Sequence, residues 1–474
     1  MTKNITTLLL LLLVGVTITL CEDEEREKGS SSSNKLFLMQ DSKSVVKTDA
    51  GEMRLFQNKD TEFLDRNMHI GLINMEPRSL FIPQYLDSNF IIFVRRGDAK
   101  LGFIYGDELE ERRLKTGDIY VIPAGSVFYL VNIGEGQRLH LICSIDPSTS
   151  LGDTFQPFYI GGGDNSQSVL AGFEPVILET AFNESREKLE RIFSKKVDGP
   201  IVYIDDSHAP SLWTKFLQLK KEEKVQHLNK MVQGQEENNE EKKQTSWSWR
   251  KLFQSVLGEE NKNIENKDRG DSPDSYNLYD RKHDFKNGYG WSSALDGDDY
   301  SLLKIPDIGV FHVNLTAGSM MVPHVNPRAT EYGIVLRGSG RIQILFPNGS
   351  NAMDTEIKVG DIFYVPRYFP FCQIASRNGA LEFFGFTTSS KKSNPQFLVG
   401  AASLLKTIMG PELAAGFGVR EDIMRDVVGA QHDAVIVSST WAAPGTGGVR
   451  EEDAYVQSKG IIGIFDDILM DDFE

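Results

Sequence analysis

Two copies of one short pattern decide the fold: Gly117-Asp118-Ile119-Tyr120-Val121-Ile122-Pro123 in the first half of the chain and Gly360-Asp361-Ile362-Phe363-Tyr364-Val365-Pro366 in the second. In each copy a Gly-Asp turn leads into a short apolar run that ends at proline. Such a run is typical of a buried strand, because β-branched and aromatic side chains favour extended backbone. The sequence therefore predicts one strand-rich plan used twice.

The repeat continues on both sides of this pattern. Many short strands separated by glycine and proline turns predict a sandwich or a closed barrel. In both halves a stretch with apolar residues at helical spacing follows the strands. We therefore expect a mainly β chain of two units, residues 36–200 and 276–460, each a β-barrel followed by a helical arm. The aligned pairs are Pro83 with Pro323, residues 90–94 with 331–335, Gly97 with Gly338, and residues 182–189 with the stretch from Phe417 to Ile423.

Length, charge and cysteine content limit the classes of protein that fit. The 474-residue length suits two or three domains, and the formal net charge of −16 argues against nucleic-acid binding, because phosphate backbones select basic surfaces. Residues 218–275 are too rich in charge to bury enough apolar surface, so we expect a mobile acidic linker there. Cys143 and Cys372, one in each barrel, make no disulfide framework, and we expect two buried free thiols.

The first 21 residues have the pattern of a secretory signal peptide. Lys3 precedes an apolar run over residues 8–20, and the run ends abruptly before Glu22. This run is short for a membrane span and lacks a basic flank, so we expect cleavage near Cys21, with a membrane anchor as the alternative. No other segment is long and apolar enough to cross a bilayer, and the mature chain is expected to have no membrane segment.

Longer spacings around the repeated pattern resemble the two motifs of the cupin family. In the second half, Gly318, His324, Asn326, Glu331 and Gly338 are separated by five, one, four and six residues, as in the first cupin motif. The second motif follows as Gly360, Pro366, Tyr368 and Phe371, and in the first half as Gly117, Pro123, Gly125, Phe128 and Asn132. The resemblance implies two tandem jelly-roll barrels.

Metal-dependent cupins hold a metal with three histidines and a glutamate from these motifs, and this chain departs from that set. In the second half His324 and Glu331 keep their types, so we expect them as the candidate metal ligands, for copper or zinc. Asn326 and Phe371 replace the other two ligands. In the first half Gln84, Phe90 and Phe128 stand at ligand positions, which predicts a barrel closed to metal chemistry.

Other interpretations of these residues stay open. Instead of binding a metal, His324 can form a hydrogen bond with Glu331 inside the barrel, as the remnant of a lost metal site, and this more ordinary interpretation is the favoured one. Strand alternation turns Cys372 away from the side that Phe371 faces, so we expect burial as a small apolar residue rather than metal binding. His312, on the preceding strand, is more often a satisfied core or surface histidine than a ligand.

The whole pattern resembles the vicilin group of plant seed globulins: a signal peptide, two cupin barrels, helical arms, degenerate metal positions and an acidic insertion between the barrels. The resemblance implies a non-catalytic seed storage protein, deposited in protein storage vacuoles or outside the cell. The alternatives are a vicilin-like protein that binds a small anion or a metal, and, less favoured, a metal-dependent cupin oxidoreductase. Asn326 and Arg341, with His324 and Glu331, are candidates for a ligand pocket at the mouth of the second barrel.

The arms and three sequons complete the expectations. Amphipathic arms after each barrel would leave apolar stripes exposed on a single copy, which favours a homo-oligomer, and the resemblance implies a trimer. The alternative is that each arm folds back on its own barrel. N-glycosylation sequons begin at Asn348, Asn183 and Asn314. Asn348, at an expected hairpin tip, should be the most accessible, whereas Asn314 in a strand and Asn183 in a helical arm should be less accessible.

Overall fold

The computed structural model describes residues 35–58, 62–105, 108–134, 136–147, 150–152, 154–162, 166–193, 199–204, 274–392 and 395–439. In this part of the chain it confirms the predicted fold class, because four antiparallel sheets form two barrels. The expected signal peptide and nearly all of the expected linker, residues 218–273, lie outside the described residues, as does the end of the second unit beyond residue 439. None of the described helices combines the length and apolar character that a membrane span requires.

The first barrel consists of two facing sheets, with strand orders β1-β2-β3-β10-β5-β8 and β11-β4-β9-β6-β7, and β12 pairs with β4. Its arm follows β11. The elements are β1 (Ser42–Thr48), β2 (Gly51–Phe56), β3 (His69–Met75), β4 (Ser79–Leu86), β5 (Phe90–Arg96), β6 (Asp98–Tyr105), β7 (Glu108–Lys115), β8 (Asp118–Ile122), β9 (Phe128–Asn132), β10 (Leu139–Ile145), β11 (Pro157–Tyr159), the 3-10 helix η2 (Val169–Gly172), α2 (Pro175–Phe182), α3 (Arg186–Phe193) and β12 (Ile201–Tyr203).

The second barrel repeats this plan, with strand orders β14-β15-β16-β23-β18-β21 and β20-β19-β22-β17-β24, and β25 pairs with β17. Its elements are β14 (Phe285–Asn287), β15 (Gly290–Leu295), the 3-10 helix η3 (Ser301–Lys304), β16 (Gly309–Leu315), β17 (Ser319–Val325), β18 (Glu331–Arg337), β19 (Ser339–Leu345), β20 (Asn351–Lys358), β21 (Ile362–Val365), β22 (Phe371–Ala375), β23 (Leu381–Thr387), β24 (Gln396–Phe397), α7 (Leu404–Thr407), α8 (Pro411–Gly416), α9 (Glu421–Gly429) and β25 (Ile436–Ser438).

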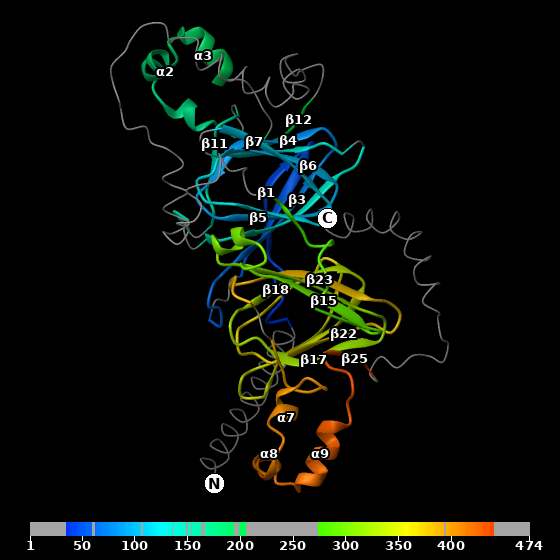
Figure 1. The fold of residues 1–474 in the computed structure, drawn as a ribbon. Coiled ribbons are helices and arrows are strands. Elements are labelled where there is room, and N and C mark those ends of the chain that lie inside the picture. The colour runs from blue at the N-terminus through cyan, green and yellow to red at the C-terminus, as the bar shows by residue number, and fades with distance from the viewer. Residues whose placement is uncertain are drawn as a thin grey trace, which may run out of the picture.

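The two barrels are stacked, and their helical arms extend at opposite ends of the molecule (Figure 1). The stack is held where β5 of the first barrel meets β23 of the second: the Phe93 ring lies flat on that of Phe384, with centroids 4.0 Å apart, and both side chains are fully buried. A strand that is buried on both faces of its sheet has apolar residues at successive positions. The contact between the barrels therefore explains the unbroken apolar run of residues 90–94.

Each barrel also receives a short strand from the segment that precedes the other barrel. Residues 37–39 bond to β21 of the second barrel, through Met39 N–H to the Ile362 carbonyl and Tyr364 N–H to the Phe37 carbonyl. In return β13 (Tyr276–Asn277) pairs with β8 of the first barrel. The two receiving strands are the two copies of the pattern from which the repeat was recognised, so the exchange follows the internal symmetry of the chain.

A loop before β3 adds polar contacts between the barrels. Arg66 binds the Asp146 carboxylate within the first barrel, and its guanidinium also donates to the carbonyls of Pro306, at 2.7 Å, and Asp307, at 3.1 Å, in the second. The neighbouring Asp65 accepts the hydroxyl of Thr388 at 3.0 Å. The Asp146 side chain is only 2% exposed, so Arg66 neutralises a buried charge while it bridges two barrels.

This bridge gives a stability prediction. Arg66→Ala leaves the Asp146 carboxylate buried without its guanidinium, and breaking a buried ion pair from one side lowers the free energy of unfolding by about 3 kcal/mol. Arg113→Ala is the matched control, because Arg113 is 70% exposed and pairs with Asp98 at the surface, where such a pair contributes about 0–1 kcal/mol. Urea unfolding of both variants measures the difference, and equal losses would contradict the bridging role.

Candidate functional site

The motif residues of the second barrel come from β17, β18 and β22, and the backbone register brings them together. His324 on β17 lies opposite Phe371 on β22, and Glu331 begins β18 opposite Val365. The first barrel has the same register, with Gln84 opposite Phe128 and Phe90 opposite Ile122. In both barrels the pairing shifts just before the first of these residues, between Met321 and His324 and between Phe81 and Gln84. The two sites are therefore structural equivalents.

His324 is held as a neutral core side chain. Its Nδ1 lies 2.8 Å from the Val322 carbonyl, which fixes the proton on Nδ1, and the ring packs against Phe371 at 4.1 Å and Phe397 at 5.4 Å between centroids. The residue is 3% exposed. Burial lowers its pKa to about 4, and the bond to Val322 only partly opposes this. In the described part of the chain, His324 does not form the expected hydrogen bond with Glu331.

Asn326 takes the place that we expected for His324. Its Nδ2 donates to Glu331 Oε1 at 2.8 Å, and its Oδ1 accepts the backbone N–H groups of Arg328 and Ala329, at 3.0 and 3.2 Å. Asn326 thus caps the turn between β17 and β18 and orients the carboxyl that follows the turn. The expected hydrogen bond between His324 and Glu331 is wrong, because Asn326 in this turn donates to the Glu331 carboxyl group instead.

Glu331 titrates unusually high for a carboxyl group. It keeps some exposed surface as a residue, yet burial of its carboxyl raises the pKa to about 7, against the lowering effect of the Asn326 hydrogen bond. The histidine therefore favours its neutral form at acid pH, and the glutamate favours its neutral form well above its ordinary range. At mildly acidic pH the interior of this barrel carries little charge.

These residues do not fit a metal centre. A stable transition-metal site needs at least three protein donors, and in the described ranges there is no group of three or more His, Cys, Asp or Glu side chains arranged to hold an ion. The Phe371 ring fills the position of a missing ligand against His324, and the Asn326 amide donates toward Glu331 instead of offering a lone pair there. The expectation of copper or zinc is therefore not supported by the donor set.

Arg341 does not belong to the mouth of the barrel, contrary to the expectation from its place in the sequence. It alternates on β19 with Ile342 and Ile344, which are fully buried in the core, so its side chain lies on the outer face of the sheet. There it forms a two-pronged pair with Asp354 and borders an open depression of about 420 Å³. The other residues that line this depression were not predicted from the sequence: Met320, Gln343, Ile374, Gln431, Val437, Ser438 and Ser439.

The interior of the first barrel is filled by side chains. Phe90 and Phe128 stack with centroids 5.8 Å apart. The space left beside Gln84 is about 10 Å³, which is barely enough for one water molecule. The Nε2 of Gln84 is buried without a hydrogen-bond partner among the described residues. A ligand larger than water has no room here, in agreement with three non-ligand residues at the ligand positions.

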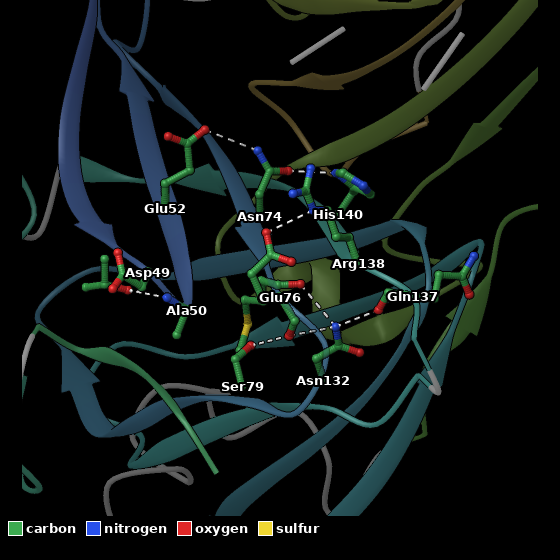
Figure 2. Close-up of polar contacts among 12 residues, drawn as sticks. Asp49, Ala50, Glu52, Asn74, Glu76, Ser79, Asn132, Gln137, Arg138 and His140 are labelled. Atoms are coloured by element: carbon green, nitrogen blue, oxygen red, sulfur yellow. Dashed lines mark hydrogen bonds and ion pairs between the residues drawn. The ribbon is translucent and has the colours of Figure 1, made fainter. Parts of the chain in front are cut away.

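Asn132, the last residue of the second motif in the first barrel, has a structural role (Figure 2). Its Nδ2 lies within hydrogen-bond distance of the carbonyls of Met75 and Glu76, both at 3.0 Å, and of Gln137, at 2.8 Å, and its Oδ1 accepts the Gly134 N–H. The side chain is 2% exposed. The asparagine thereby joins three chain segments at one end of the barrel, and the motif position serves the fold.

The remaining candidates are placed as follows. His312 is 2% exposed and its Nε2 lies 2.9 Å from Glu382, so it is a satisfied buried histidine. Cys143 and Cys372 are free and buried, as expected. Of the sequons, Asn348 is exposed beside the turn glycine Gly349 and Asn314 is half-buried in β16, whereas Asn183 is exposed in the turn between α2 and α3, contrary to the expectation that its helical arm would hide it.

Comparison with known proteins agrees with this geometry. The cupin family pattern matches residues 37–188 and again residues 276–425. A vicilin-like seed storage protein of Arabidopsis thaliana is 52% identical over 428 residues, which cover 89% of this chain and 83% of the relative. The chain belongs to the cupin family, among the vicilin-like seed storage proteins. A second vicilin-like seed storage protein of the same plant is 30% identical over 387 residues, covering 79% of this chain and 69% of that relative.

Solved vicilins share the fold. The hazelnut vicilin, from Corylus avellana, superposes with a TM-score of 0.67 at 21% identity and covers 85% of this chain and 99% of its own. A vicilin of Solanum melongena, described with different anionic ligands in structurally similar pockets, has the same TM-score at 19% identity, over 86% of this chain and 99% of that one. The two-barrel architecture with arms is thus that of the vicilins.

The pKa of Glu331 predicts a pH-dependent effect of one substitution. Because the folded-state pKa of about 7 lies above the ordinary value of 4.5, ionisation opposes folding, and stability is lost as the pH rises from about 4.5 to 7. Glu331→Gln removes that loss and keeps an acceptor for Asn326. The urea midpoint of the variant should exceed that of the wild type at pH 8 and match it near pH 4.5.

A control separates this effect from a general change in charge. Glu356→Gln removes a carboxylate from an exposed position on β20 and should leave the urea midpoint nearly the same at both pH values. A Glu331→Gln midpoint that differs from the wild type by the same amount at pH 4.5 and pH 8 would show that the carboxyl group is not titrated in this range.

Proposed function

We propose that the protein is a nutrient reservoir without catalytic activity, secreted by way of a cleaved signal peptide, stored in protein storage vacuoles or outside the cell, and assembled as a trimer through its helical arms. The observation that carries the proposal is the pair of exposed apolar arms at opposite ends of a molecule whose first barrel is filled by side chains and whose second barrel keeps two of four ligand types. The absence of a complete ligand set argues against catalysis, because the cupin chemistry of the alternative needs an open metal centre.

Both arms present large apolar side chains to solvent. On the first arm Val176 is 59% exposed and Ile177 is 48% exposed, and on the second arm Phe417 is 60% and Val427 67% exposed. Neither arm lies against its own barrel (Figure 1), so the alternative of arms folded back on the barrels does not cover these surfaces. Clusters of exposed apolar residues of this kind mark protein–protein contacts.

Each arm forms ion pairs within itself. Arg186 binds Glu190 at 2.9 Å on α3, Arg420 pairs with Asp422 beside α9, and Arg425 pairs with Glu421 one turn away. Ion pairs closed within one helix leave the apolar residues as the part of the surface that gains from a partner. Two similar but different arms at opposite ends suit head-to-tail contact, which closes into a ring when the rotation between copies allows it.

Binding of a small carboxylate anion is a second candidate function. The depression beside Arg341 offers a guanidinium, two serines and two glutamines over apolar side chains, and the Solanum melongena vicilin is described with anionic ligands in its pockets. The Asp354 carboxylate already pairs with Arg341, so an anion has to share the guanidinium and binding there is weak. Storage therefore remains the favoured function.

Substitutions in one arm test the assembly. The double substitution Ile423→Glu with Val427→Glu places two charges on the exposed face of α9, where apolar side chains contribute roughly 1.5–3 kcal/mol each when buried. We expect the dissociation constant of the proposed trimer, measured by light scattering after size exclusion, to rise at least about a hundredfold. Leu151→Glu is the control, because Leu151 is 82% exposed but lies outside the arms.

Two results would count against the assembly through arms. A wild-type protein that elutes as a monomer at micromolar concentration removes the trimer from the proposal. A double variant that keeps the trimer mass, while the Leu151 variant loses it, would move the contact from the arms to the barrel surface.

A further inference from the structure

The outer edge of β21 in the second barrel receives an extended segment from the start of the described chain. In the sheet order β21 is the last strand, and an edge strand offers unpaired N–H and C=O groups to another extended segment. Residues 36–39 fill this edge: Tyr364 N–H donates to the Phe37 carbonyl at 2.9 Å, Met39 N–H donates to the Ile362 carbonyl at 2.8 Å, and Leu38 faces Phe363 in an isolated bridge. The added segment is held by main-chain bonds, whatever its sequence.

A side-chain slot beside this edge selects what the backbone holds. The Phe37 ring is fully buried and meets three aromatic rings edge-on, at 5.2 Å from Tyr364, 5.5 Å from Phe369 and 6.3 Å from Phe63 between centroids. Met39, two residues on, is 4% exposed, and the intervening Leu38 is half-buried. Alternate side chains of the segment thus enter the protein, with phenylalanine as the anchor.

We infer that the β21 edge and this aromatic slot form a binding site for an extended apolar peptide with a central phenylalanine, and that the chain fills the site with its own residues 35–39. Main-chain bonds give the affinity and the slot gives the choice of side chain, as in other cases of strand addition. The covalent connection to β1 keeps the segment at a high effective concentration, which excludes competing peptides.

The equivalent edge of the first barrel supports a selective slot in the second. Residues 276–278 occupy the β8 edge, where the Leu278 N–H donates to the Gly117 carbonyl at 2.8 Å. The side-chain contacts there differ: Asn277 Nδ2 donates to Asp118 Oδ1 at 2.7 Å, the Tyr276 ring lies 5.7 Å from that of Tyr300, and the buried residue is Leu278, which carries no aromatic ring. The two edges therefore accept strands by the same backbone pattern but with different side-chain partners, which is what two sites of different specificity require.

The connection between the segment and its barrel is open to cleavage. Gln40 and Asp41 are exposed, and they link the buried Met39 to the start of β1 at Ser42. A cut in this stretch leaves residues 35–39 bound by their own contacts alone, so the segment can be exchanged for another peptide of the same pattern.

An exchange experiment tests the inference. In the full-length protein the recognition sequence of a specific endoprotease is inserted between Gln40 and Asp41, ahead of β1, the product is cut and dialysed, and a fluorescent peptide of residues 35–41 is added. We expect an increase in anisotropy with the cut protein and none with the uncut one. The same peptide with Phe37→Ala should bind roughly a hundredfold more weakly, because it loses the buried ring.

A second variant keeps the test decisive if the cut protein unfolds. Phe37→Ala in the uncut chain weakens the occupant, so the wild-type peptide should now bind in trans and restore part of the lost thermal midpoint. Phe173→Ala, which removes a 53% exposed ring from the first arm, is the control and should permit no peptide binding. No peptide binding in either arrangement, or equal binding of both peptides, would overturn the inference.

Discussion

An inward-facing position of a small barrel holds either a core side chain or a metal ligand, and in this chain most such positions hold core side chains. Phe90, Phe128 and Phe371 stand where a metal-binding cupin has ligands, and each is at most 2% exposed. Their rings stabilise the barrels by burying apolar area, and they occupy positions where a metal-binding cupin has ligands. Packing of the hydrophobic core therefore takes the place of metal binding at these positions.

The filled barrels also explain how the surfaces are used. The apolar outer faces of the two central sheets are consumed in stacking one barrel on the other, with Phe93 against Phe384 and the exchanged strands at the edges. The outer sheets carry ion pairs such as Lys100 with Glu111 and Arg341 with Asp354. Each arm still exposes several large apolar side chains, among them Val176 and Ile177 on the first arm and Phe417 and Val427 on the second.

The sequence predicted what depends on spacing and alternation. The repeat placed Gln84 with Phe128 and His324 with Phe371, and the registers agree. Alternation separates Cys372 from the side of its strand that Phe371 faces, and it also explains why Arg341, next to the buried Ile342, lies on the outer face of its sheet. Contacts that depend on three-dimensional structure escaped. Asn326 captures Glu331 through a turn that spacing alone does not define, and the exchange of residues 37–39 for residues 276–278 joins segments that are far apart in the chain.

Elemental analysis of the purified full-length protein is the most direct test of the central claim that the barrels are scaffold. Two of the four ligand types are kept, but Glu331 accepts a hydrogen bond from Asn326 and the His324 ring packs against Phe371. The protein should therefore retain less than about a tenth of an equivalent of any transition metal after dialysis. One full equivalent of copper, zinc, iron or manganese per chain, lost on His324→Ala and kept on Gln84→Ala, would show a working metal centre in the second barrel and contradict the account.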